Sequence, residues 1–332
     1  MFERKVGHEL LMSAIALVLV AGIALPAYAA TSTDSPGAGA DAISPPKPCV
    51  ASDTVLLIQD VVPWGIGAGQ DARGAFVNEL ILQNKLWCSI GSDQIGATDL
   101  SQFDEIIIAS AQTQAFYDNL FPSGVIHPAI NTWVLNGGIL SASLAHFFAA
   151  GWEGDTFVGG VKEVFSPSQD DNIADASHPL VADTLPCPSG NCAPIVDVGA
   201  GNDLDNWNFA DHGFFTNLPA GTTVILTRAS DGKPVAIEYP HGSGRVIANV
   251  NTDAWRYAGF GPPGVPNLKY VANDIAYQDI LAIPVGGLLI STDMTALFVA
   301  GIFANAFWML PAIVGIAGTG IYFVKTRKQN LE

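Results

Sequence analysis

The stretch WVLNGGILSASLAHFF, residues 133–148, decides how the rest of the chain is interpreted. It is typical of a helix end, a break at Gly137 and Gly138, and a short buried strand over residues 139–142. We expect a new helix to start abruptly at Ser143. Because ligands of open α/β sheets bind at the carboxyl ends of the strands, Ser143 is expected where a nucleophile would lie.

Other short apolar runs, such as TVLLIQD and EIIIAS, have the continuous character of strands buried on both faces. The expected strands of this first half span residues 54–60, 86–91, 105–110 and 139–142. The expected helices span residues 75–84, 115–120 and 125–136, the last beginning near Pro128. Strands that alternate with helices predict a parallel, doubly wound sheet.

The second half of the chain has a different pattern. Three consecutive strands are expected at residues 223–228, 235–239 and 245–250, with hairpin-like turns between them. Residues 267–281 have the pattern of an amphipathic helix that packs back on the sheet. The glycines at 65, 67, 69 and 74 do not have the GxGxxG spacing of a dinucleotide site, so we expect no cofactor there.

Both ends of the chain resemble membrane-type segments. Arg4, Lys5, an apolar run and the small residues around Tyr28 predict a secretory signal, with an uncleaved anchor as the alternative. Residues 294–324 carry no charge and precede Lys325, which predicts one transmembrane helix with the C-terminus in the cytoplasm. A hairpin of two helices is the alternative. The expected divisions are a signal (1–29), a flexible linker (30–50), a folded domain (51–282), a juxtamembrane linker (283–293), an anchor (294–324) and a cytoplasmic tail (325–332).

Charge and cysteine content restrict the function of the exported part. Between the signal and the tail there are 28 acidic and nine basic residues, so the domain repels nucleic acid, which we exclude as a partner. Four cysteines in an exported chain predict two disulfides. Cys187 and Cys192 bracket a short loop and are expected to pair, which leaves Cys49 with Cys88; a metal site is the rival interpretation.

Two segments point to a family. DNIADASHPLVADTLP (residues 171–186) and KPVAIEYPHGSGRVIANVNTD (residues 233–253) resemble segments of class I glutamine amidotransferase-like domains with a flavodoxin-like fold, in particular the ThuA-like branch. With the order of elements, the resemblance covers about residues 54–281. It implies the fold more securely than an activity.

The resemblance also indicates which residues to compare with the amidotransferase triad. Ser143, within SASLA, stands where that family places its nucleophilic cysteine after the fourth strand. Asn251 and Asp253 stand where the family has His-x-Glu, so an acidic residue is retained but the base is replaced. The triad is therefore lost. We expect Ser143, Asn251, Asp253 and Asp60, which ends the first strand, to form a binding edge.

Alternatives remain open at this point. His146, three residues after Ser143, or His212 would supply a base for a serine hydrolase. Asp203, Asp205 and Asp211 in the loop NDLDNWNFAD are candidate calcium ligands, although the loop lacks the EF-hand pattern and a solvated turn is the simpler interpretation. No other cofactor is expected.

The C-terminal segment carries a second resemblance. DMTALFV and WMLP within its last 50 residues are similar to the anchors of secreted surface proteins of ammonia-oxidising archaea, which implies display outside a plasma membrane. We therefore expect a surface protein whose domain binds a ligand or partner without catalysis. A surface serine hydrolase, and a structural component that contacts surface-layer or other envelope proteins, are the alternatives.

Overall fold

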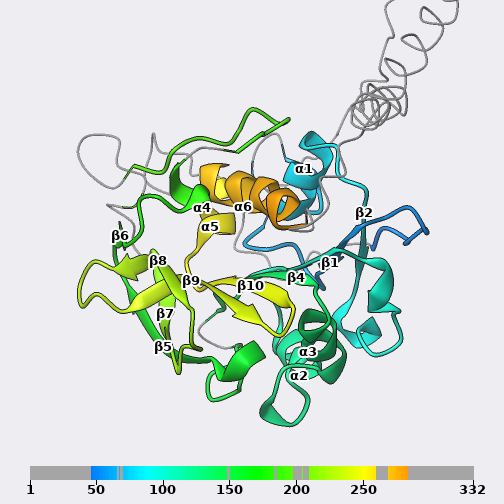
Figure 1. Cartoon of the computed structure of the whole chain (residues 1–332), viewed down its shortest axis with the longest axis horizontal. Coiled ribbons are helices and arrows are strands. Elements are labelled where there is room, and N and C mark those ends of the chain that lie inside the picture. The colour runs from blue at the N-terminus through cyan, green and yellow to red at the C-terminus, as the bar shows by residue number, and fades with distance from the viewer. Residues whose placement is uncertain are drawn as a thin grey trace, which may run out of the picture. The chain divides into compact units, whose positions relative to one another are not determined.

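The computed structural model describes residues 46–65, 67, 70–147, 150–182, 185–196, 204, 209–258 and 268–282, and Figure 1 shows their arrangement. The expected signal, most of the flexible linker over residues 30–50, the juxtamembrane linker, the anchor and the cytoplasmic tail lie outside these residues. None of the helices in the described part combines the length and apolar character that a membrane span requires.

A mixed sheet of eight strands forms the centre of the domain, in the order β2-β1-β3-β4-β10-β9-β8-β6. The first five of these strands are parallel. They span Trp87–Ile90 (β2), Val55–Ile58 (β1), Glu105–Ile108 (β3), Ile139–Ser143 (β4) and Gly244–Asn249 (β10). If β10 is counted as the fifth strand, this is the 2-1-3-4-5 order of flavodoxin-like doubly wound sheets.

The rest of the sheet is antiparallel, as the hairpin-like turns expected in the second half imply. Three further strands continue it antiparallel beyond β10. They span Pro234–His241 (β9), Thr223–Arg228 (β8) and Asp171–Ile173 (β6). The tight turns of the second half explain this direction, because a hairpin turn can only join antiparallel neighbours.

Helices cover both faces of the sheet (Figure 1). One face carries α1 (Ala75–Leu82), α5 (Asp253–Tyr257) and α6 (Leu268–Leu281), with α4 (Pro179–Ala182) against α6. The other face carries α2 (Gln114–Leu120) and α3 (Pro128–Leu135). Short 3-10 turns span Ser92–Gln94 (η1), Leu100–Gln102 (η2), Pro122–Gly124 (η3) and Val158–Gly160 (η4).

The apolar strands divide their side chains between these two faces. In β1, Leu56 and Ile58 belong to the larger core cluster, whereas Val55 and Leu57 belong to the cluster that α1, α5 and α6 cover. This alternation follows from the period of two of a strand, and it explains why the run VLLI is buried at every position.

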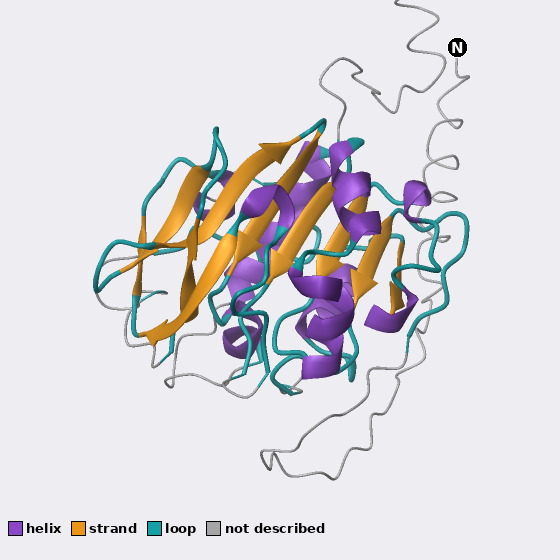
Figure 2. Ribbon diagram, turned by 90° about the horizontal axis from the view of Figure 1, so that it is seen from below, coloured by secondary structure: helices purple, strands orange, loops and turns teal. Residues whose placement is uncertain are grey.

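A second, two-stranded antiparallel sheet pairs β5 (Lys162–Ser168) with β7 (Asp211–Thr216), and Figure 2 shows the strands of both sheets from below. An isolated bridge joins Asp211 of β7 to Asn251, which follows β10. The small sheet is thereby linked to the carboxyl edge of the main sheet.

The turn between α3 and β4 depends on its two glycines. Gly137 has a φ of 118°, in the left-handed region that side chains disfavour. Gly138 lies against the indole of Trp133, so that a Cβ there would be 2.3 Å from a ring carbon. The Trp133 Nε1 donates a hydrogen bond of 3.1 Å to the carbonyl of Phe103, which fixes the indole across the turn.

The helix expected to begin at Ser143 does not exist: residues 144–147 are irregular. The reason is that their carbonyls accept hydrogen bonds from donors elsewhere. Ala111 N–H donates to the carbonyl of Ala145, and the indole of Trp152 donates to that of Leu144. Carbonyls that are already bonded in this way are not available to a first helical turn.

The two predicted disulfides are confirmed. Cys49 is bonded to Cys88, and Cys187 to Cys192. The first bond joins the segment that precedes β1 to β2, the edge strand of the sheet. Beside it, Lys47 N–H donates to the hydroxyl of Ser89, and Ser89 N–H donates to the carbonyl of Lys47.

Candidate functional site

Ser143 is the last residue of β4, and its hydroxyl faces the start of α5 and the end of β10. Its side chain is 1% exposed. Its hydroxyl donates a hydrogen bond of 3.1 Å to Asp253 Oδ2, and Asn249 Nδ2 donates one of 3.1 Å to the same hydroxyl. The serine is therefore held between strand β10 and the start of α5, with its proton directed to a carboxylate.

Three of the residues expected at the binding edge come together here. Asn251 Oδ1 accepts the backbone N–H of Asp253 at 3.2 Å, and Asp253 in turn bonds Ser143. Asn251 Nδ2 is buried without a hydrogen-bond partner among the described residues. Burial raises the pKa of Asp253 to about 7, aided by the negative charge of Asp274, although the N–H of Ala254 and the Ser143 hydroxyl oppose the shift.

A second serine–aspartate contact lies two residues earlier on the same strand. Ser141, on the same face of β4, donates a hydrogen bond to Asp274 of α6, and Gln278 lies beside the same carboxylate. Burial raises the pKa of Asp274 to about 6. The sequence interpretation missed Asp274 because it treated residues 267–281 only as a packing helix. An acidic residue between Val271 and Ile275, both on the buried face, was the available signal.

His146 does not approach Ser143 as a base. Its Nε2 lies 3.1 Å from Glu163 Oε2, and its Nδ1 donates to the carbonyl of Phe147 at 2.9 Å. Burial lowers the pKa of His146, but the hydrogen bond and charge of Glu163 outweigh it, so the net shift is upward. Because Nδ1 donates to a carbonyl and Nε2 is bonded to Glu163, neither ring nitrogen is placed to take a proton from Ser143.

His212, the other candidate base, does not contact Ser143 either. Its Nδ1 donates to the backbone carbonyl of His146, and burial lowers its pKa. Its ring packs edge-on against Trp64, with the centroids 5.3 Å apart. Among the described residues, no histidine belongs to the hydrogen-bond partners of Ser143.

Asp60 forms a separate part of the carboxyl edge. It follows β1 and accepts hydrogen bonds from the backbone N–H and the hydroxyl of Ser92, both at 2.7 Å. Gln112, which follows β3, accepts the backbone N–H of Asp60 at 2.8 Å. The carboxylate of Asp60 therefore caps the turn after β2 instead of joining the hydrogen bonds around Ser143.

The candidate calcium ligands are only partly described. Asp203 and Asp205 lie outside the described residues. Asp211 is fully buried beside Asp171, and Arg228 Nε lies 3.6 Å from its carboxylate. Burial raises the pKa of Asp211 to about 7, and burial together with the charge of Asp211 raises the pKa of Asp171. Across the described residues, no group of three or more acidic, histidine or cysteine side chains is arranged to hold a metal.

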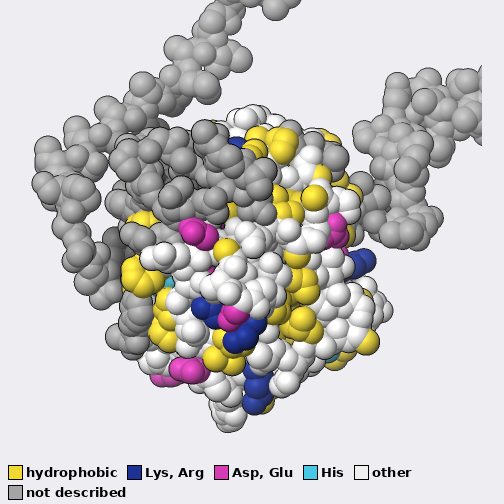
Figure 3. All heavy atoms as spheres, turned by 90° about the vertical axis from the view of Figure 1, so that its left-hand side faces the viewer, with side chains coloured by type: hydrophobic (Ala, Val, Ile, Leu, Met, Phe, Trp, Pro, Cys, Tyr) yellow, Lys and Arg dark blue, Asp and Glu magenta, His cyan; other side chains and the backbone are white. Residues whose placement is uncertain are grey.

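The surface around Asp171, Asp211 and Arg228 carries charges of both signs. Figure 3 shows the side of the domain formed by β5, β6, β7 and β8, where basic and acidic side chains lie next to one another among uncharged ones. In the turn between β8 and β9, Asp231 pairs with Lys233 at 3.2 Å and with Arg228 at 3.6 Å. On the described part of this face, acidic and basic side chains are therefore mixed.

No family model matches the chain. An uncharacterized protein of Clostridium acetobutylicum is 26% identical over 231 residues, which cover 68% of this chain and 20% of that protein. The chain thus spans about a fifth of the length of this curated relative.

Similar solved structures share little sequence with the chain. A cytoplasmic protein from Salmonella typhimurium is 13% identical with a TM-score of 0.40, covering 68% of this chain and 98% of that one. A Thermoplasma acidophilum protein that is provisionally named as part of a GMP synthase is 10% identical with a TM-score of 0.37, covering 69% and 97%. A β-galactosidase from Rahnella sp. R3 is 13% identical with a TM-score of 0.39, covering 70% and 32%. The class of the chain therefore rests on its own strand order: a mixed α/β domain with a flavodoxin-like parallel core.

Proposed function

We propose that this chain is an extracellular surface protein on a single membrane anchor, and that its domain is a non-catalytic relative of class I glutamine amidotransferases that binds a ligand or a partner. The flavodoxin-like strand order supports the relationship, as do the positions of Ser143 after the fourth strand and Asp253 after β10. Two disulfides are in keeping with an oxidising compartment.

The proposal that the domain is non-catalytic rests on the environment of the Ser143 hydroxyl. A serine becomes nucleophilic when an adjacent base takes its proton and a substrate can approach its oxygen. Here the residue is 1% exposed and its oxygen accepts the amide of Asn249. Strand β10 and helix α5 supply both of its partners, so a substrate carbonyl has no line of approach.

One feature favours the alternative of a surface serine hydrolase. The pKa of Asp253, about 7, gives this carboxylate the basicity of an ordinary imidazole, and it accepts the hydrogen bond of the Ser143 hydroxyl. Burial argues against this alternative, since the reacting oxygen would have to be exposed by moving α5. The two proposals make different predictions for covalent labelling.

The test is labelling of the purified, folded protein with a fluorophosphonate probe that reacts with activated serines. We expect no labelling above that of Ser143→Ala, with Ser141→Ala as the matched control for removing a buried hydroxyl from the same strand. Labelling of the wild type and of Ser141→Ala that disappears in Ser143→Ala would establish the hydrolase instead.

A further inference from the structure

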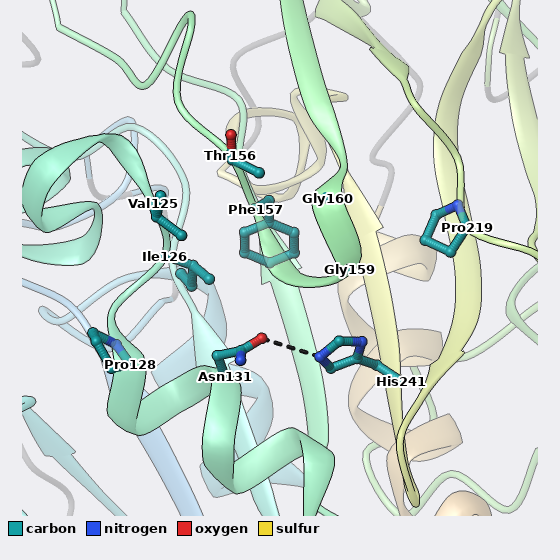
Figure 4. A pocket seen from close by; sticks show the side chains of 10 residues that line it. All are labelled: Val125, Ile126, Pro128, Asn131, Thr156, Phe157, Gly159, Gly160, Pro219 and His241. Atoms are coloured by element: carbon teal, nitrogen blue, oxygen red, sulfur yellow. Dashed lines mark hydrogen bonds between the residues drawn. The ribbon is translucent and has the colours of Figure 1, made fainter.

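A pocket of about 510 Å³ lies on the α2 and α3 side of the sheet, away from Ser143 (Figure 4). The start of α3 forms one wall, the turn η4 before β5 forms the second, and the end of β9 forms the third. Its volume is in the range of small-molecule sites. Residue Phe157 lies at its inner side and is 1% exposed.

The lining offers no charged side chain with which a ligand charge could pair. None of the residues around the pocket is an aspartate, glutamate, lysine or arginine, although the chain as a whole has a net charge of −17. Three lining side chains, Val125, Pro128 and Pro219, are both apolar and accessible, whereas Ile126 and Phe157 are buried beneath them. A ligand that fits this surface needs an uncharged, partly apolar face.

One wall of the pocket is bare backbone. Gly159 and Gly160 have φ values of 72° and 89°, which glycine adopts without strain. A Cβ on Gly160 would meet no atom within 4 Å, so the space beside it is open. A Cβ on Gly159 would lie 3.0 Å from Pro219 and 3.6 Å from His241 Nδ1, so the missing side chain keeps that nitrogen accessible.

Two polar side chains provide a defined pair of hydrogen-bonding groups. His241 Nε2 lies 3.0 Å from Asn131 Oδ1, as the dashed line in Figure 4 shows. Because an amide oxygen only accepts, Nε2 carries the proton and Nδ1 is left as an acceptor. Burial lowers the pKa of His241, which favours this neutral form. Asn131 Nδ2 supplies donors beside it, so the pair matches a hydroxyl, which both donates and accepts.

We propose that this pocket binds a neutral sugar ring, with the apolar face of the ring on Val125 and Pro128 and a hydroxyl within reach of Asn131 Nδ2 and His241 Nδ1. This proposal rests on the proposed binding function and names its ligand class. A pyranose combines C–H faces with hydroxyl edges and has no charge, which are the properties that the lining selects. The open rim at Gly160 leaves room for the ring to be the end of a longer saccharide.

The test uses the full chain in phospholipid nanodiscs, which avoid sugar-based detergents. Methyl glucopyranoside, methyl galactopyranoside and methyl mannopyranoside are titrated separately, and binding is measured by saturation-transfer NMR of the sugar protons. We expect a saturable signal with at least one of them. Affinity should fall at least fivefold in Val125→Glu, which places a charge on a rim residue that is 51% exposed, and in His241→Phe.

Leu86→Glu is the matched control, because Leu86 is 56% exposed and does not line the pocket. It should leave the affinity unchanged. The absence of a saturable signal with all three sugars, or a signal that Val125→Glu leaves unaltered, would overturn the proposal while leaving a non-catalytic binding domain intact. Hydrolysis of p-nitrophenyl glycosides that depends on Ser143 would overturn the proposed function itself.

Discussion

At Ser143, the burial of the hydroxyl separates a nucleophile from a packing residue. The resemblance to the amidotransferase family predicts that Ser143, Asn251 and Asp253 share one edge of the sheet, because they stand where that family places its triad. It does not predict that the hydroxyl is buried beneath α5, since burial depends on how a distant helix packs. Nor does it predict that His146 is bonded by Glu163, which is 17 residues away on the small sheet.

The buried carboxyl of Asp253 makes stability dependent on pH. Its pKa rises from the ordinary value of 3.8 to about 7. Below pH 4 the group is protonated in the folded and unfolded chains. Between pH 4 and 7 only the unfolded chain ionises, so the contribution of Asp253 to folding is lost as pH rises, and it is constant above pH 7. This loss is on the order of 4 kcal/mol.

Asp253→Asn should therefore reduce the fall in unfolding free energy between pH 4 and 7, measured by urea denaturation at each pH. Asp99→Asn is the control: Asp99 is exposed, and the Ser101 hydroxyl lowers its pKa, so its titration lies below this interval. If Asp253→Asn and the wild type had the same slope from pH 4 to 7, the buried carboxyl would not be the source of the dependence.

At the scale of elements, continuous apolar runs were sufficient to locate the strands of the parallel core. VLLI, WCSI and EIII are buried at every position, and only a strand covered on both faces accommodates such runs. The segment after Ser143 could not be predicted in the same way. Its backbone carbonyls are bonded by Ala111, Trp152 and His212, which the chain brings together only in the folded state.

The α3–β4 turn can be tested at Gly138. An alanine Cβ there would lie 2.3 Å from the indole of Trp133, so the indole must move and lose its hydrogen bond to the carbonyl of Phe103. We expect Gly138→Ala to lower the free energy of unfolding by about 1–3 kcal/mol, as overpacking in cores does. Chemical denaturation followed by tryptophan fluorescence measures this loss.

Gly96→Ala is the matched control for this substitution. A Cβ on Gly96 would come no closer than 3.4 Å to His127, and the residue does not have a positive φ. Its effect should stay within about 1 kcal/mol and can be stabilising, because alanine restricts the unfolded chain. Equal losses at Gly96 and Gly138 would show that contact with Trp133 is not the cause.

At the scale of the molecule, the domain combines buried acids behind the sheet with an uncharged pocket on the opposite face. Asp253 and Asp274 lie between β4 and the helices α5 and α6, whereas the pocket lies on the side of α3. Because the sheet separates the two regions, the effects of substitutions in one and in the other on stability and on binding should add.

The two disulfides should contribute unequally to the stability of the whole chain. Cys49–Cys88 closes 39 residues and holds the entry of the chain against β2, where Ser89 N–H donates to the carbonyl of Lys47. Chain-entropy arguments give about 4 kcal/mol for a loop of this length and about 2 kcal/mol for the five-residue separation of Cys187–Cys192. Replacing Cys49 and Cys88 together by alanine should therefore lower the urea midpoint more than the same change at Cys187 and Cys192.

Both bonds can also be tested by counting free thiols. Protein exported with its own N-terminal segment should show no alkylatable thiol after denaturation without reductant. A larger loss at Cys187 and Cys192 would place the main covalent restraint in the short loop, and four free thiols in the exported protein would contradict both bonds.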